Sequence, residues 1–156
     1  MVSKMNFLFF VFILSGFLNA QNPEKESDLL WLSNLDEAQT QAKKSDNNIL
    51  VYFSGSDWCR PCQLLRLEVF DKKAFKDFAD ENLVLVQFDF PARAKNKLPE
   101  EQQELNDKMA ERFNKDGVFP KVLVLNKDTS VLGEIDGYRQ SGMDDIIGRI
   151  KKMINK

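Results

Sequence analysis

The most informative residues of this chain are the two cysteines of the segment Trp58-Cys59-Arg60-Pro61-Cys62, which are its only thiols. They follow the apolar run 48–53, which predicts a buried strand. Two cysteines three positions apart, at the start of the helix expected after that strand, can close a disulfide across a single turn. The spacing therefore indicates thiol–disulfide chemistry, with Cys59 the more accessible sulfur.

The residues around the first cysteine favour its ionised form. A thiolate is the attacking species in thiol–disulfide exchange. Cys59 stands at the predicted helix N-terminus, where unpaired backbone N–H groups and the helix dipole stabilise negative charge. Arg60 adds a permanent cation, and Pro61 falls in the first turn, where its missing N–H leaves no intrahelical bond unmade. We therefore predict a lowered pKa for the Cys59 thiol and a disulfide that is somewhat more oxidising than one with an uncharged dipeptide between its cysteines.

Two other uses of the cysteine pair stay open. A structural disulfide closing so short a loop would contribute only about 2 kcal/mol through loop-closure entropy. Copper(I) can bind two thiolates, although Asp57 stands where a methionine is usual in copper motifs. The chain has no histidine, which excludes a Cys–His nucleophile, a c-type haem attachment and a four-ligand structural zinc site.

The beginning of the chain predicts export. Lys4, the apolar core 7–18 and the small residue Ala20 have the order found in secretory signal peptides. The apolar core is shorter than the ~20 residues that a membrane-spanning helix needs. We expect residues 1–20 to be cleaved, 21–28 to form a disordered lead-in and 29–156 to form one domain. An uncleaved leader that tethers the protein to a membrane is the alternative.

The overall charge gives little reason to expect a charged polymer as partner. The chain has 22 Lys and Arg against 24 Asp and Glu, a net charge of −2. No basic stripe interleaved with aromatic residues is present, so we expect no nucleic-acid binding. We expect a monomer.

Hydrophobic periodicity predicts a single α/β domain. Helices are expected at 35–44, 59–69, 72–79, 99–114 and along the apolar face from Met143 to Ile154, and strands at 49–53, 83–88, 121–125 and 131–135. The first two strands, separated by helices, should be parallel, and the last two should form an antiparallel hairpin. The prediction is a mixed sheet of about four strands with helices on both faces. Residues 29–32 are either an edge strand or a strap.

This order of elements resembles the thioredoxin superfamily. The resemblance is carried by the cysteine motif after the first buried strand and by Val118-Phe119-Pro120 before the hairpin. Trp31, the helix at 36–38 and the run Phe53-Ser54-Gly55-Ser56-Asp57-Trp58-Cys59 are also similar to exported bacterial thioredoxin-like proteins and to the C-terminal domain of membrane disulfide-interchange reductases. The resemblance implies a thioredoxin fold.

The resemblance also implies roles for individual residues. Cys59 would be the exposed nucleophile and Cys62 the buried resolving thiol. Pro120 would be a cis-proline facing the disulfide, Phe119 would pair through its backbone with an extended partner segment, and Trp58 would shield the sulfurs. The implied function is an exported, bacterial periplasmic thiol–disulfide oxidoreductase that acts on protein thiols and disulfides, receives electrons from a membrane protein and uses no organic cofactor or metal. A thioredoxin-fold binding module with a structural disulfide is the alternative.

One feature departs from the family pattern. Many thioredoxins bury a carboxylate beneath the cysteine pair, whereas this chain has Val51-Tyr52-Phe53 there. We expect Asp57 to be exposed and a poor substitute, and proton transfer to Cys62 to pass through water. The basic segment 93–97, between two prolines, is expected to be a solvated loop.

Overall fold

The structure is a computed structural model that describes residues 29–155. The predicted signal peptide 1–20 and lead-in 21–28 lie outside the described residues. The described elements are β1 (Trp31–Leu32), α1 (Leu35–Ser45), β2 (Asn48–Ser54), α2 (Arg60–Leu65), the π-helical turn η1 (Arg66–Phe70), α3 (Lys73–Asn82), β3 (Leu83–Asp89), the 3-10 turn η2 (Ala94–Asn96), α4 (Glu100–Phe113), β4 (Lys121–Leu125), β5 (Val131–Asp136) and α5 (Met143–Ile154).

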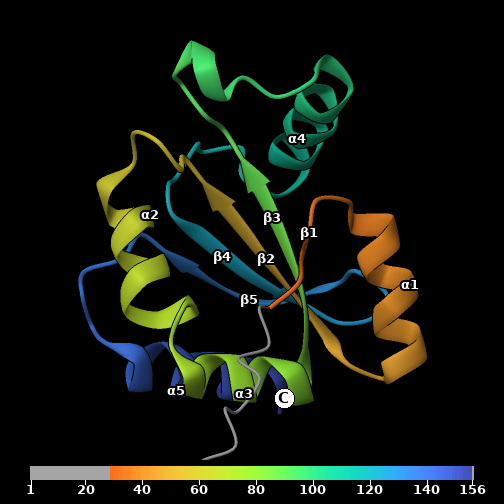
Figure 1. Ribbon diagram of the computed structural model, residues 1–156. Coiled ribbons are helices and arrows are strands. Elements are labelled where there is room, and N and C mark those ends of the chain that lie inside the picture. The colour runs from red at the N-terminus through yellow and green to blue at the C-terminus, as the bar shows by residue number, and fades with distance from the viewer. Residues whose placement is uncertain (1–28, 156) are drawn as a thin grey trace, which may run out of the picture.

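These strands form one mixed sheet in the order β1-β3-β2-β4-β5 (Figure 1). β2 and β3 are parallel, and β4 pairs antiparallel with both β2 and β5. The predicted parallel pair and hairpin are therefore confirmed. The count of about four strands was too low, because β1 adds a parallel edge strand in which Trp31 pairs with Leu85. A strand of two residues is too short to produce a recognisable alternation.

The core lies on both faces of this sheet because successive side chains of a strand point to opposite sides. Leu50 and Tyr52 of β2 face one cluster, which α2, η1, α3 and α5 cover. Ile49, Val51 and Phe53 face the other cluster, against α1 and the C-terminal half of α4. The predicted covering of both faces by helices is therefore confirmed, and the central strand β2 is buried up to its last residue.

Beyond the ends of β2 and β3 the chain forms a projecting segment that contains η2 and α4 (Figure 1). Its most buried anchor is Asn106, which is 1% exposed and donates from Nδ2 to the carbonyl of Asp89 at 2.7 Å. This bond fixes α4 to the last residue of β3. Within residues 29–155 no helix is both long and apolar enough to cross a membrane.

Candidate active site

The two cysteines lie together at the start of α2 and form a disulfide, with their Cα atoms 5.3 Å apart. Cys59 is the N-cap of the helix, and its Sγ accepts a hydrogen bond from the backbone N–H of Cys62 at 3.2 Å. The N–H of Cys59 donates to the carbonyl of Gly55 at 2.8 Å. Pro61 occupies the first helical turn, as predicted. The turn after β2 thus delivers both sulfurs to the helix N-terminus.

Both cysteines are buried in this oxidised form. Cys59 is 4% and Cys62 1% exposed, and both belong to the cluster that contains Tyr52 and Leu65. The expectation of an exposed Cys59 is therefore wrong for the disulfide state, because the Cys59–Cys62 disulfide at the start of α2 packs against the core. Cys62 is the deeper of the two, and Arg60 beside them is exposed.

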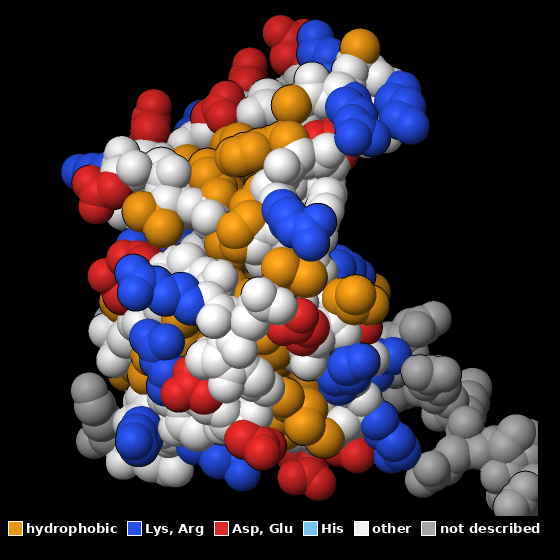
Figure 2. All heavy atoms as spheres, turned by 90° about the vertical axis from the view of Figure 1, so that its left-hand side faces the viewer, with side chains coloured by type: hydrophobic (Ala, Val, Ile, Leu, Met, Phe, Trp, Pro, Cys, Tyr) orange, Lys and Arg blue, Asp and Glu red, His pale blue; other side chains and the backbone are white. Residues whose placement is uncertain are grey.

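Trp58 borders the disulfide and is held from three sides. Its indole N–H donates to the carbonyl of Phe90 at 2.7 Å, and its ring meets Phe119 edge-on with centroids 5.4 Å apart. The ring also lies directly against Gly55, where a Cβ would stand 2.3 Å from indole Cε2. Half of Trp58 stays exposed. Figure 2, which faces the side of the molecule that carries α2, shows hydrophobic side chains gathered beneath the projecting segment and bordered by charged ones.

The peptide bond between Phe119 and Pro120 is cis, and it precedes β4. The segment that leads to this peptide bond is held by Asn114, which is 4% exposed. Asn114 accepts from the N–H of Val118 through Oδ1 and donates to the carbonyl of Val118 through Nδ2, both at 3.0 Å. Sequence analysis did not identify Asn114, because a single polar residue after a helix has no distinctive pattern.

Asp57 holds the basic segment against the cysteine motif. Its carboxylate accepts hydrogen bonds from the backbone N–H groups of Ala92 and Arg93 at 2.9 and 3.0 Å, and from Nδ2 of Asn96 at 2.8 Å. The bond from the Ala92 N–H is the main reason that the pKa of Asp57 lies below its usual value. Asp57 as a whole residue is partly exposed, and its carboxylate is engaged by the segment after β3. It serves as an anchor for the segment after β3.

A second carboxylate, Asp89, lies at the same end of the sheet and was also missed. Ser54 and Asp89 end the parallel strands β2 and β3 in register, and the Ser54 hydroxyl lies 2.7 Å from Asp89 Oδ1. Asp89 also accepts from the N–H of Ser56 at 2.8 Å and from its hydroxyl. The neighbouring Tyr52 donates from its hydroxyl to the Cys62 carbonyl at 3.0 Å. Burial raises the pKa of Tyr52.

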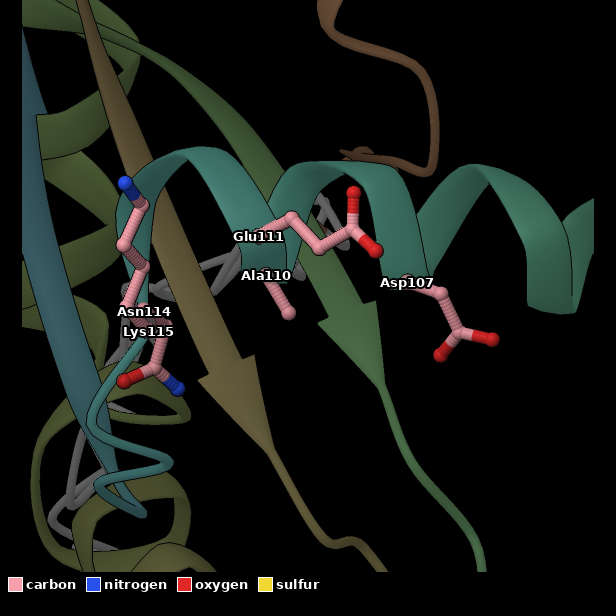
Figure 3. Close-up of a pocket in the computed structure, with 5 residues that line it drawn as sticks. All are labelled: Asp107, Ala110, Glu111, Asn114 and Lys115. Carbon is pink, nitrogen blue, oxygen red and sulfur yellow. The ribbon is translucent and has the colours of Figure 1, made fainter.

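A separate, open depression of about 580 Å³ runs along α4 and the residues that follow it (Figure 3). It is lined by Asp107, Ala110, Glu111, Asn114 and Lys115. Its lining includes neither cysteine, and its carboxylates point outward from α4 in the close-up. We therefore place the chemistry at the disulfide.

A family model described as thioredoxin-like matches residues 30–127, and the chain belongs to this family. The chain is 28% identical over 137 residues to the disulfide bond reductase DsbH of Chlamydia pneumoniae, an alignment that covers 88% of this chain and 80% of that protein. A solved structure of a DsbH oxidoreductase superposes with a TM-score of 0.76 at 27% identity, covering 88% of this chain and 92% of the other.

The fold has a more distant likeness as well. The oxidised C-terminal domain of DsbD from Neisseria meningitidis superposes with a TM-score of 0.53 at 18% identity, over 79% of this chain and 98% of that domain. This likeness concerns the fold alone. The family, the thioredoxin fold and the Cys59–Cys62 disulfide together make the protein a thiol–disulfide oxidoreductase.

Proposed function

We propose that the protein is an exported reductase of protein disulfides, in which Cys59 attacks and Cys62 resolves. The observation that carries this proposal is the Cys59–Cys62 disulfide at the beginning of α2, with Cys59 as the helix N-cap. The reducing direction is supported by the likeness to a disulfide bond reductase.

The reaction transfers two electrons from the dithiol to the partner. The Cys59 thiolate attacks one sulfur of the partner's disulfide, forming a mixed disulfide and releasing the other sulfur as a thiolate that takes a proton. The Cys62 thiolate then attacks Cys59 Sγ, which closes the Cys59–Cys62 bond and releases the second partner thiol. A dithiol donor must afterwards reduce the Cys59–Cys62 disulfide, and we propose a membrane electron-donor protein for this step.

Three features support Cys59 as the attacking residue. It is less deeply buried than Cys62. As the N-cap it already accepts a backbone N–H bond on its sulfur, an interaction that favours the thiolate. The exposed Arg60 follows it directly in the chain. In the reduced protein we therefore expect the pKa of the Cys59 thiol to be lowered.

We assign partner binding to the aromatic border of the disulfide. Trp58 is half-exposed and its ring meets Phe119, the residue before Pro120. An extended partner segment would pair with the backbone at Phe119 and place its cysteine against Cys59, while the Trp58 ring limits access of other molecules to the mixed disulfide.

Export is the remaining part of the proposal. The order of Lys4, the apolar core 7–18 and Ala20 supports a leader that is cleaved after residue 20 and a domain that works in a bacterial periplasm. N-terminal sequencing of the protein recovered from cells tests this part. A mature chain that begins at Gln21 is expected, and a chain that retains the leader would mean a membrane tether.

The experiment for the chemistry is a trapping assay with insulin as the disulfide substrate. Reduced Cys62→Ser protein should accumulate a mixed disulfide that dithiothreitol releases, because no second thiol resolves it. Reduced Cys59→Ser protein should form none, and neither variant should turn over. The double variant is the control. Turnover by Cys59→Ser would overturn the assignment, and wild-type protein that leaves insulin intact would favour a binding module with a structural disulfide.

A further inference from the structure

The resolving step requires that Cys62, which is 1% exposed in the oxidised form, lose a proton. We propose that Asp89, at the end of the neighbouring strand, takes this proton through the hydroxyls of Ser54 and Ser56 and through water in a small cavity beside Cys62. This inference rests on the proposed function, because it concerns the step in which Cys62 attacks the mixed disulfide.

The cavity connects the cysteine with polar side chains of β2, β3 and α2. It measures about 60 Å³ and is lined by Tyr52, Ser54, Ser56, Cys62, Gln63, Arg66 and Gln87. This volume is enough to admit water, and its lining offers the several polar partners that a buried water needs. A proton that leaves Cys62 therefore has a polar route of short steps.

Hydrogen bonds along one wall of the cavity run in a single direction toward Asp89. Arg66 donates to Oε1 of Gln87 at 3.1 Å, and Nε2 of Gln87 donates to the Ser54 hydroxyl at 2.8 Å. Since the Ser54 oxygen accepts from Gln87, its own hydrogen is directed to Asp89 Oδ1, 2.7 Å away. A hydroxyl oxygen has a second lone pair, so Ser54 can accept a proton from cavity water while it passes its own to Asp89.

Ser56 forms a parallel connection. Its hydroxyl donates to Oδ2 of Asp89, so each carboxylate oxygen is joined to a hydroxyl that lines the cavity. Ser56 is kept in place by its N–H bond to Asp89 at 2.8 Å and by Gln63, whose Nε2 donates to the Ser56 carbonyl at 3.0 Å. Asn106 holds the backbone of Asp89 from the other side.

The other ionisable groups nearby are less suited to this task. Tyr52 lines the cavity, but burial raises the pKa of its hydroxyl and keeps it protonated. Asp57 is occupied by the segment after β3 and does not line the cavity. Three charged groups also influence the pKa of Tyr52, namely Arg66, its ion-pair partner Asp71, and Asp89. Of these, Asp89 is the carboxylate joined to the cavity hydroxyls.

The Cys62 S–H bond breaks and the proton arrives on the Asp89 carboxylate, while the sulfur electron pair attacks Cys59 Sγ. The Cys59–Cys62 bond forms, the bond between Cys59 and the partner sulfur breaks, and the partner leaves as a thiolate that is protonated by solvent. Asp89 then returns its proton to solvent.

A rapid-mixing experiment with 5,5′-dithiobis(2-nitrobenzoate) tests this inference, because each attack releases one coloured thiolate. The first phase reports attack by Cys59, and the second, concentration-independent phase reports resolution by Cys62. We compare wild type with Asp89→Asn, which keeps the size of the side chain, and with Asp89→Glu, which restores a carboxylate. Asp77→Asn is the matched control, because Asp77 makes an exposed pair with Lys73 on α3.

In Asp89→Asn the second phase should be slower by about tenfold or more, and its rate should rise in proportion to hydroxide where the wild-type rate is nearly flat. The first phase should stay unchanged, Asp77→Asn should match wild type, and Asp89→Glu should recover much of the loss. An unchanged second phase and pH profile in Asp89→Asn would overturn the inference, as would equal slowing of both phases. A wild-type protein that releases no coloured thiolate would instead contradict the proposed function.

Discussion

At the scale of single residues, the position of Trp58 depends on the absence of a side chain at Gly55. The indole lies so close to Gly55 that a Cβ on this residue would stand 2.3 Å from Cε2 and 2.6 Å from Nε1. The same ring donates to the Phe90 carbonyl and packs on Phe119. A change at Gly55 should therefore be transmitted to the border of the disulfide.

We predict that Gly55→Ala lowers the free energy of unfolding by about 1–3 kcal/mol, the usual cost of overpacking. It should also slow exchange with protein substrates more than exchange with small disulfides, because the displaced indole no longer borders the partner site. Urea unfolding and the two exchange rates measure these effects.

Gly148→Ala is the matched control. Gly148 lies inside α5, and a Cβ there would meet nothing within 4 Å. The substitution should stabilise the protein by about 0.5–1 kcal/mol, because alanine is the better helix former, and should leave exchange unchanged. A Gly55→Ala protein as stable and as active as Gly148→Ala would contradict our account of Trp58.

The cysteine pair could be located from the sequence alone, but the polar residues Ser54 and Asp89 beside it could not. Cys59, Cys62 and Pro61 are adjacent in the chain, so their spacing alone carries the information. Ser54 and Asp89 are 35 positions apart and meet only because β2 and β3 end in register. A prediction of strand pairing to single-residue accuracy would have been needed to find them.

At the scale of elements, local signals place helix ends well. The N-cap of α1 is Asn34 and not the neighbouring Ser33. Its Oδ1 accepts from the N–H groups of Asp36 and Glu37 at 2.8 and 3.2 Å.

Replacing Asn34 by Ala should therefore cost about 1 kcal/mol of unfolding free energy, while Ser33→Ala should cost well under half of that. The exchange rate should be the same in both, since α1 packs into the core cluster on one face of the sheet and the cysteines belong to the cluster on the other face. Thermal unfolding of the two variants decides between the residues. Equal losses would show that the cap contributes little.

The fold was predictable from the sequence where an element is long and periodic, and not where it depends on distant contacts. The strands β2, β3 and β4 each show a clear apolar run, whereas β1 is recognisable only through its pairing with β3. The passage from α2 into the π-helical turn η1 has no sequence signal that we recognise. The projecting segment is held by the hydrogen bonds from Ala92 to Asp57 and from Asn106 to Asp89, which join residues 35 and 17 positions apart.

At the scale of the whole molecule, the buried tyrosine should give a pH dependence of stability. Burial raises the pKa of Tyr52 in the folded protein above its unfolded value of about 10. A raised pKa means that stability is fully present below about pH 10 and is lost as the pH rises through the folded value.

Urea unfolding of the oxidised protein and of Tyr52→Phe at increasing pH measures this effect. At neutral pH the variant should be less stable by about 0.5–1.5 kcal/mol, because the bond from the tyrosine hydroxyl to the Cys62 carbonyl is lost. Above about pH 10 the difference should shrink, since phenylalanine cannot ionise. A difference that stays constant with pH would show that Tyr52 does not contribute to the alkaline loss.

The central claim is that the Cys59–Cys62 pair cycles as a reductant of protein disulfides, and its equilibrium reduction potential tests that claim most directly. Equilibration with glutathione buffers, followed by thiol alkylation, gives the value. We predict a potential near that of thioredoxin, about −270 mV, adjusted upward by Arg60. A potential near −120 mV would identify an oxidant, and a Cys59–Cys62 disulfide that resists reduction well below about −300 mV would identify a structural disulfide. Either result would contradict the account.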